Sequence, residues 1–104
     1  MVMSNEENFW RILVNQCRQE QRQNSSTQEG AAIVRLADFL LQETAACNAS
    51  DLHIEPLGGE LRFRLRIDGL LTVMPYRLPG DLASPLISRI KVLEPQQGSP
   101  LVRL

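Results

Sequence analysis

Apolar and polar residues recur along the chain with two different periods, and the first half has the period of helices. Over residues 5–22 the apolar positions return every three or four residues, which predicts an amphipathic helix. Ser4, followed three residues later by Glu7, forms a capping-box pattern at its start. The apolar stripe consists of Phe9, Trp10, Leu13, Val14 and Cys17. We expect this helix to pack on the rest of the domain or on a second copy.

A second helix follows a polar stretch. Residues 19–28 are rich in Gln, Asn and Ser, which indicates a fraying helix end and a loop. Ser26 and Glu29 repeat the capping pattern, and the helix is expected to end near Asn48. Its stripe is long and regular, and consists of Ile33, Leu36, Ala37, Leu40, Leu41, Thr44 and Ala45.

From Ser50 the period changes to two, which is typical of half-buried β-strands. One strand precedes Gly58-Gly59 and a second follows these glycines, so the two are expected to pair antiparallel. The polar positions are Asp51, His53 and Glu55 on the first strand and Arg62, Arg64 and Arg66 on the second. Apolar residues alternate with them at Leu52, Ile54, Leu61, Phe63, Leu65 and Ile67.

The remaining residues add a hairpin, a helix and a tail. Asp68-Gly69 is a strong signal for a type I′ turn, and residues 70–74 supply the returning strand. Ser84 and Pro85 are expected at the N-cap and first position of a third helix over residues 85–93. The tail begins with a turn at residues 95–98 and ends in either a short strand or a frayed end.

These elements predict an α+β fold, with an antiparallel sheet of three or more strands packed with about three helices. A length of 104 residues and a hydrophobic content of 43% suit one compact domain. We divide the chain into an N-terminal helix with a polar linker, residues 1–28, and an α+β domain, residues 29–104.

Charge and hydropathy exclude several classes of protein. Eleven basic residues face 12 acidic ones, so the chain lacks the positive excess of a general nucleic-acid binder. No apolar run approaches the roughly 20 residues of a membrane span, and no signal peptide is recognisable, which predicts a cytoplasmic protein without membrane insertion. Cys17 and Cys47 both fall on apolar helix faces and are expected to be buried free thiols, with a disulfide or a reactive thiol as the alternative.

The charged strand positions have two interpretations. Asp51, Glu55 and the three arginines Arg62, Arg64 and Arg66 either form a cross-strand ladder of ion pairs or offer guanidinium groups to a partner carboxylate or phosphate. The single histidine, His53, is expected to be structural, and no metal site is predicted.

No catalytic constellation is recognisable. The sequence has no G-x-x-x-x-G-K-S/T loop, and Gly58-Gly59 lacks the helix start and the Lys that hold phosphates. No serine is placed beside His53 as a nucleophile with its base. We therefore expect no enzyme activity and no cofactor.

Three ordered segments resemble the N-terminal domain of type II secretion and type IV pilus ATPases. They are Ala49-Ser50-Asp51-Leu52-His53-Ile54-Glu55-Pro56, Arg64-Leu65-Arg66-Ile67-Asp68-Gly69-Leu70-Leu71 and Leu86-Ile87-Ser88-Arg89-Ile90-Lys91-Val92-Leu93. The resemblance covers residues 31–93. It implies an α+β domain joined by a linker to a RecA-like ATPase domain, in hexameric motors at the inner membrane.

The same resemblance implies partners and a site. Arginines of this domain approach nucleotide phosphates in the family motors, and Arg89 matches one such position, with Arg66 a weaker candidate. A helix-surface or ion-pair role for Arg89 stays open beside the phosphate-facing one. The second family position is Thr72 here. After Leu93 the chain lacks about ten family residues, and residues 95–99 resemble a shortened Pro-Gln-Asp-Gly-Arg motif in which Gln97 and Ser99 replace the charged residues.

The resulting hypothesis is a non-catalytic domain that positions or regulates a secretion or pilus motor through protein contacts. Its expected partners are the P-loop domain, other machinery proteins or a second copy. Two alternatives stay open, namely a ligand- or nucleotide-sensing module and a degenerate, truncated relic.

Overall fold

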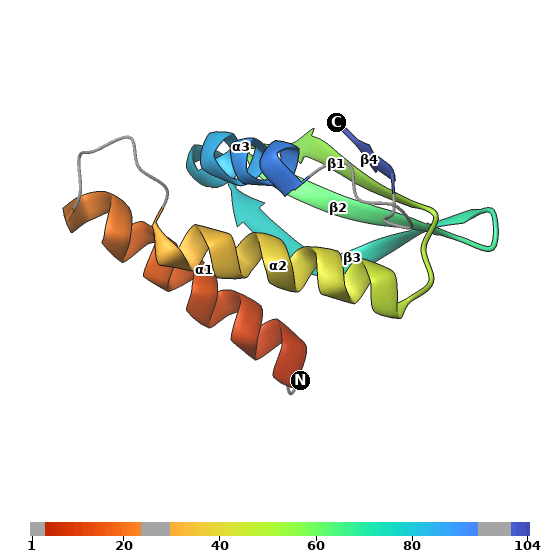
Figure 1. Cartoon of the computed structure of the whole chain (residues 1–104), viewed down its shortest axis with the longest axis horizontal. Helices are drawn as coiled ribbons and strands as arrows, with labels where there is room; N and C mark the ends of the chain where they lie inside the picture. The colour runs from red at the N-terminus through yellow and green to blue at the C-terminus, as the bar shows by residue number, and fades with distance from the viewer. Residues whose placement is uncertain (1–3, 24–29, 94–100) are drawn as a thin grey trace.

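The computed structural model describes residues 4–23, 30–93 and 101–104. Within these residues, three α-helices share one buried core with a four-stranded sheet (Figure 1). The elements follow in the order α1 (Asn5–Gln23), α2 (Ala31–Ala46), β1 (Asp51–Leu57), β2 (Glu60–Ile67), β3 (Leu70–Pro79), the 3-10 turn η1 (Gly80–Leu82), α3 (Ala83–Leu93) and β4 (Leu101–Arg103). The predicted α+β fold is confirmed.

The strands lie in the order β3-β2-β1-β4. The pairs β1–β2 and β2–β3 are antiparallel, as expected, whereas β4 pairs parallel to β1, so the described sheet is mixed. Both predicted turns are present. Gly58 and Gly59 have φ of 57° and 83°, and Asp68 and Gly69 have φ of 52° and 81°, which are the left-handed values that a type I′ turn requires.

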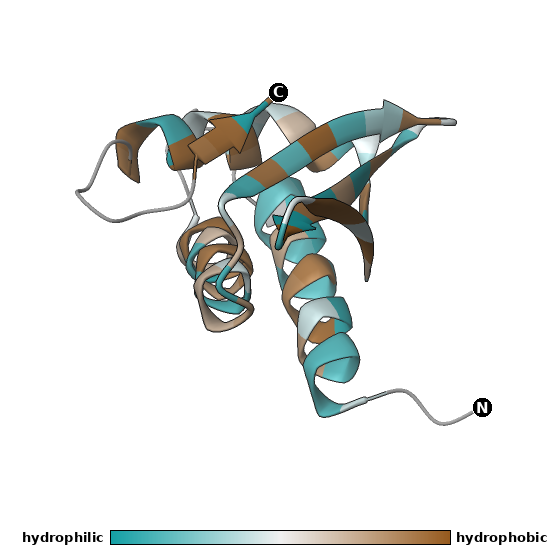
Figure 2. Ribbon diagram, turned by 90° about the vertical axis from the view of Figure 1, so that its right-hand side faces the viewer, coloured by the Kyte–Doolittle hydropathy of each residue, from teal (hydrophilic) through white to brown (hydrophobic). Residues whose placement is uncertain are grey.

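One face of the sheet is apolar because successive strand residues point to opposite sides. Figure 2 shows this alternation of hydrophobic and hydrophilic residues along the strands. Leu52, Phe63 and Leu65 are buried on the apolar face and join one core with residues of all three helices. The other face carries the polar positions of β1 and β2.

Helix α1 is anchored in this core by Trp10. The indole stacks on Tyr76 of β3, with ring centroids 5.1 Å apart, and meets Phe63 edge-on at 5.5 Å. Trp10, Leu13, Val14 and Cys17 are buried, whereas Phe9 is partly exposed against Phe39 of α2. The first helix therefore packs on the domain. Ser4 accepts a hydrogen bond from the Glu7 amide at 3.1 Å, which confirms the N-terminal cap.

The start of α2 is capped differently from the prediction. Its N-cap is Gly30, which has no side chain to accept a hydrogen bond. Instead, both carboxylate oxygens of Glu20 in α1 accept from the Ala32 amide, at 3.1 and 3.3 Å. A negative charge at a helix N-terminus is stabilising. Ser26 and Glu29, the expected capping pair, lie outside the described residues, as does the expected turn at residues 95–98.

Two boundaries differ from the predicted ones near Pro75 and Pro85. Strand β3 continues past Pro75 to Pro79, because an edge strand tolerates proline and its register with β2 shifts between Arg62 and Arg64. Helix α3 begins at Ala83, so Ser84 is not its N-cap but lies in the first turn. The preceding turn η1 supplies the helical start that the Ser-Pro signal was expected to provide.

The two cysteines differ in solvent exposure. Both are free thiols, and Cys17 is buried as predicted. Cys47 is exposed, which corrects the prediction for this residue. It occupies the C-cap of α2, just before Asn48 with φ of 55°, where the chain leaves the helix and the apolar stripe no longer faces the core.

Candidate functional site

Six polar side chains of β1 and β2 form what we call the charged face of the sheet. It consists of Asp51, His53, Glu55, Arg62, Arg64 and Arg66, and it lies opposite the apolar face because these positions alternate with buried residues. The strand register places Asp51 across from Arg66, His53 across from Arg64 and Glu55 across from Arg62. The predicted cross-strand pairing of opposite charges is confirmed.

Glu55 forms the tightest contact of the charged face. Arg64 donates to it through two nitrogens, with Nε to Oε1 at 2.6 Å and the second nitrogen to Oε2 at 2.7 Å. Arg62, directly opposite, reaches Oε1 only at 3.5 Å. The hydrogen bonds from Arg64, together with the charges of both arginines, hold the pKa of Glu55 below its ordinary value. The bidentate contact holds the Arg64 guanidinium on the Glu55 carboxylate of the neighbouring strand.

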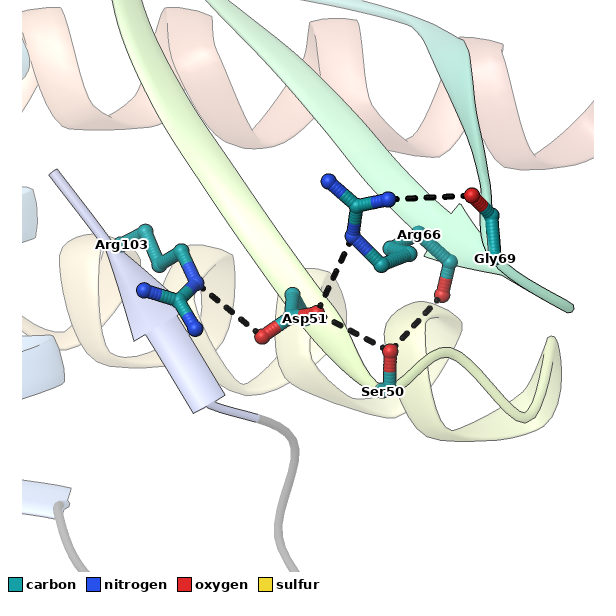
Figure 3. A network of polar contacts seen from close by, with 5 residues as sticks. All are labelled: Ser50, Asp51, Arg66, Gly69 and Arg103. Atoms are coloured by element: carbon teal, nitrogen blue, oxygen red, sulfur yellow. Dashed lines mark hydrogen bonds and ion pairs between the residues drawn. The ribbon is translucent and has the colours of Figure 1, made fainter.

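Asp51 is the centre of a second cluster, which joins three strands (Figure 3). Its carboxylate accepts a hydrogen bond from Ser50 Oγ at 3.0 Å and contacts Arg66 Nε at 3.5 Å and Arg103 Nε at 3.2 Å. Arg66 also donates to the carbonyl of Gly69 in the hairpin turn, at 3.0 Å. Asp51 is buried. It links β1 to β4 through Arg103 and, through Arg66, to the β2–β3 turn.

The electrostatics of Asp51 follow from these contacts. The Ser50 hydroxyl is the main reason that the pKa of Asp51 lies below its ordinary value, and the charges of Arg103 and Arg66 act in the same direction. Burial opposes them. The carboxylate thus remains ionised in its partly desolvated place because three donors surround it.

His53 lies between the two carboxylate clusters. The strand registers place it across from Arg64 on one side and Arg103 on the other. Its Nε2 is buried and has no hydrogen-bond partner among the described residues. The part of the chain that the structure describes contains no group of three His, Cys, Asp or Glu side chains that could hold a metal ion.

Comparison with known proteins identifies the family. A family model described as type II/IV secretion system protein matches residues 26–99. That match covers more than half of the chain. The chain belongs to the type II/IV secretion system protein family.

Individual relatives of the secretion family agree with this assignment. The type II secretion system protein E of Xanthomonas campestris pv. campestris is 35% identical over an alignment of 83 residues, and the match covers 71% of this chain and 14% of that protein. The protein of the same name from Dickeya dadantii is 38% identical over an alignment of 86 residues, and the match covers 74% of this chain and 17% of that protein. The type IV pilus assembly ATPase TfpB of Acinetobacter baylyi is 43% identical over 61 residues, or 59% of this chain and 10% of that protein. The chain therefore corresponds to a small part of these secretion proteins.

The remaining predicted residues occupy other places in this secretion-family domain. Asp68 and Gly69 form the β2–β3 turn, where both adopt the positive φ that the turn requires. Arg89 lies in α3, whose buried Leu86 and Ile90 belong to the core on the apolar side of the sheet. Arg89 therefore belongs to a helix on the apolar side of the sheet and not to the charged face. Its match to a phosphate-facing position stays a prediction.

Two arginines that sequence reasoning did not include extend the charged face. Arg103 of β4 lies across from His53, and Arg77 of β3 lies across from Arg62. Within the described residues, the Arg77 guanidinium has no ion-pair partner, and its side chain is exposed. Period-two spacing within Val102-Arg103-Leu104 could have indicated Arg103, but the predicted end of the third strand at residue 74 placed Arg77 outside the sheet.

No helix among the described residues has both the length and the apolar character needed to cross a bilayer.

Proposed function

We propose that this chain is a non-catalytic domain of, or related to, a type II secretion or type IV pilus assembly ATPase, and that it positions or regulates the motor through protein contacts. Its place would be on the cytoplasmic side of the inner membrane, where the resemblance to the family motors puts it. Membership of the secretion family and a match to only 10–17% of the relatives' lengths support a part that works with other domains.

The observation that carries the proposal is the charged face, with Arg77 beside it. Arg62, Arg64 and Arg66 are engaged with Glu55 and Asp51, and these pairs hold the guanidinium groups in fixed positions. Arg77 adds an exposed guanidinium that no acid of the described residues neutralises. A preorganised array with one uncompensated cation favours docking of a partner carboxylate over binding of a metal or a cationic ligand.

A binding experiment with a charge reversal tests this surface. The partner is the purified P-loop domain of the secretion or pilus ATPase from the same organism, and affinity is measured by calorimetry. Arg77→Glu should weaken binding severalfold, because a like charge would then face the partner's carboxylate. The matched control is Arg22→Glu, which reverses an exposed arginine on α1. Equal losses in both variants, or none in either, would contradict docking through the charged face.

The structure changes which arginine should be mutated. Arg64→Ala would leave the partly buried Glu55 carboxylate without its bidentate partner, so a loss of binding in that variant would mix docking with local rearrangement. Arg89→Ala serves as a separate probe of the phosphate-facing role that the resemblance implies. That role predicts that Arg89→Ala weakens binding to the ATP-loaded P-loop domain more than binding to the nucleotide-free one.

The non-catalytic part of the proposal has its own test. ATP hydrolysis by the isolated chain should be indistinguishable from buffer, because the P-loop amides, Lys and Mg²⁺-binding hydroxyl of phosphoryl transfer are missing from the sequence. Turnover that a point mutation in this chain abolishes would refute it. A rise in melting temperature with free nucleotide would instead favour the nucleotide-sensing alternative.

A further inference from the structure

The outer strand of the β2–β3 hairpin has an apolar edge. Figure 1 shows the hairpin extending beyond the helices. Strand β3 lies at one edge of the sheet, and Leu70, Leu71 and Val73 near the hairpin tip are 72%, 38% and 52% exposed. Residues 70–74 contain neither a charge nor a proline. Edge strands are usually protected by such residues, so this half of β3 is open to pairing.

The register defines which backbone groups of this edge point outward. Ile67 and Leu70 flank the two-residue turn and form a hydrogen-bonded pair, as do Leu65 and Thr72. In an antiparallel ladder the intervening residues direct their N–H and C=O groups away from the partner strand. Leu71 and Val73 therefore present two donors and two acceptors at the free edge.

The second half of β3 is closed to pairing. Pro75 has no N–H to donate, and the register with β2 is irregular between Arg62 and Arg64. The Arg77 carbonyl accepts the indole N–H of Trp10 at 2.8 Å. The open edge is therefore confined to residues 70–74, a length that matches a short strand pairing.

We infer that two copies of this chain pair antiparallel through residues 70–74, about a two-fold axis at Thr72. In this arrangement Leu71 of each copy exchanges both backbone hydrogen bonds with Val73 of the other, which uses all four outward groups of the edge. The two Thr72 residues face each other as a non-hydrogen-bonded pair. Leu71 and Val73 also pair their apolar side chains across the axis.

Charge complementarity favours a second copy as the occupant. Antiparallel pairing about Thr72 brings the exposed turn residue Asp68 of each copy toward Arg77 of the other, and within the described residues Arg77 has no acid of its own. The hairpin extends beyond the helices, so the edge near its tip is open to a second copy. The contact involves five residues a side, against the 20–30 or so of a stable interface, so the dimer is weak and depends on concentration.

Sedimentation velocity over a range of concentrations, from micromolar to near millimolar, tests the pairing. The weight-average mass of the unmodified chain should rise toward that of a dimer, and Val73→Lys should keep it at the monomer value. The matched control, Ile12→Lys, changes a 49% exposed residue on α1 and should leave association unaltered. A monomer at every concentration, or equal association of all three proteins, overturns the inference. Circular dichroism of Val73→Lys confirms that its fold is intact.

A cysteine substitution tests the two-fold axis itself. In a Cys47→Ser background, Thr72→Cys places two thiols across the axis at the short Cα separation of a non-hydrogen-bonded pair, where a disulfide can form. Mild oxidation should therefore produce a covalent dimer rapidly. Ile12→Cys in the same background controls for random collision. Equal rates for the two variants, or faster dimerisation of Ile12→Cys, would show that the copies do not meet about Thr72.

Discussion

Trp10 of α1 donates its indole N–H to the main-chain carbonyl of Arg77 in β3, and the same ring stacks on Tyr76 next to it. This one side chain attaches the N-terminal helix to the edge of the sheet through both a hydrogen bond and ring contacts. The indole is buried and the bond is partly buried, so loss of the donor leaves a main-chain acceptor that water replaces only in part.

We therefore predict that Trp10→Phe lowers the free energy of unfolding by about 1–3 kcal/mol, since it leaves the Arg77 carbonyl without its donor while keeping most of the ring packing. Trp10→Ala should cost more, about 3–5 kcal/mol. Urea denaturation followed by circular dichroism measures both. Ile12→Ala, on the exposed side of α1, is the control and should change stability by less than about 0.5 kcal/mol. Equal effects at residues 10 and 12 would show that α1 is not held by Trp10.

The two carboxylates of the charged face predict an acid-dependent loss of stability. Asp51 and Glu55 have pKa values below their ordinary ones, mainly because of the Ser50 hydroxyl and the Arg64 fork, respectively. In the acid range the unfolded chain then binds more protons than the folded one, so stability rises with pH. This contribution is fully present above the unfolded pKa of about 4 and is lost as the pH falls through the lower folded values.

Asp51→Asn should accordingly flatten the dependence of melting temperature on pH below about pH 5, because one of the two proton-linked groups is removed. Arg103→Gln keeps the acid but removes one of its cations, so the folded pKa of Asp51 moves back toward the unfolded one, and the acid loss of stability should be smaller and should end at a higher pH than in the unmodified protein. Thermal unfolding at a series of acidic pH values measures both effects. Parallel curves for all three proteins would mean that Asp51 does not couple to folding.

The cysteines should differ in reactivity. Burial, with a smaller contribution from Glu20, raises the pKa of Cys17 to about 11, whereas Cys47 is exposed. Since the thiolate is the reactive form, native protein should release one equivalent of thionitrobenzoate quickly from Ellman's reagent and a second only after denaturation. Cys47→Ser should abolish the fast phase. Two fast thiols in the native protein would contradict the packing of α1 around Cys17.

Sequence reasoning succeeded where local signals decide the structure. Period-two alternation located β1 and β2 and their charge pairing, and Asp68-Gly69 predicted the turn, because each depends on neighbouring residues alone. Reasoning failed where a distant residue supplies the partner. Glu20 caps α2 from another helix, and Arg103 reaches Asp51 from 52 residues away. Spacing can indicate that Arg103 lies on a strand, but it does not reveal the partner of either residue in a single sequence.

The same distinction explains the errors at the proline positions. The third strand was predicted over residues 70–74, yet edge position and a register shift let β3 continue past Pro75, and both are properties of the assembled sheet. Pro85 was expected at the first position of its helix, but η1 starts the helical path earlier, at Gly80. Gly80 lies beside the β1–β2 turn, because its amide donates to the Gly59 carbonyl at 2.9 Å.

That contact gives a final prediction, in which alanine at Gly80 and alanine at Gly69 each lower stability, but for different physical reasons. A Cβ at Gly80 would stand 2.7 Å from the Gly59 carbonyl oxygen, so the backbone must move, and we expect Gly80→Ala to cost about 1–3 kcal/mol. A Cβ at Gly69 meets nothing within 4 Å, but φ of 81° disfavours any side chain, and Gly69→Ala should cost about 1 kcal/mol. Asn at the two positions separates the causes, because Asn tolerates positive φ but still carries a Cβ. Gly69→Asn should therefore recover much of the lost stability, whereas Gly80→Asn should be at least as unstable as Gly80→Ala. Recovery at both positions would show that space beside Gly59 does not limit the choice of residue at Gly80.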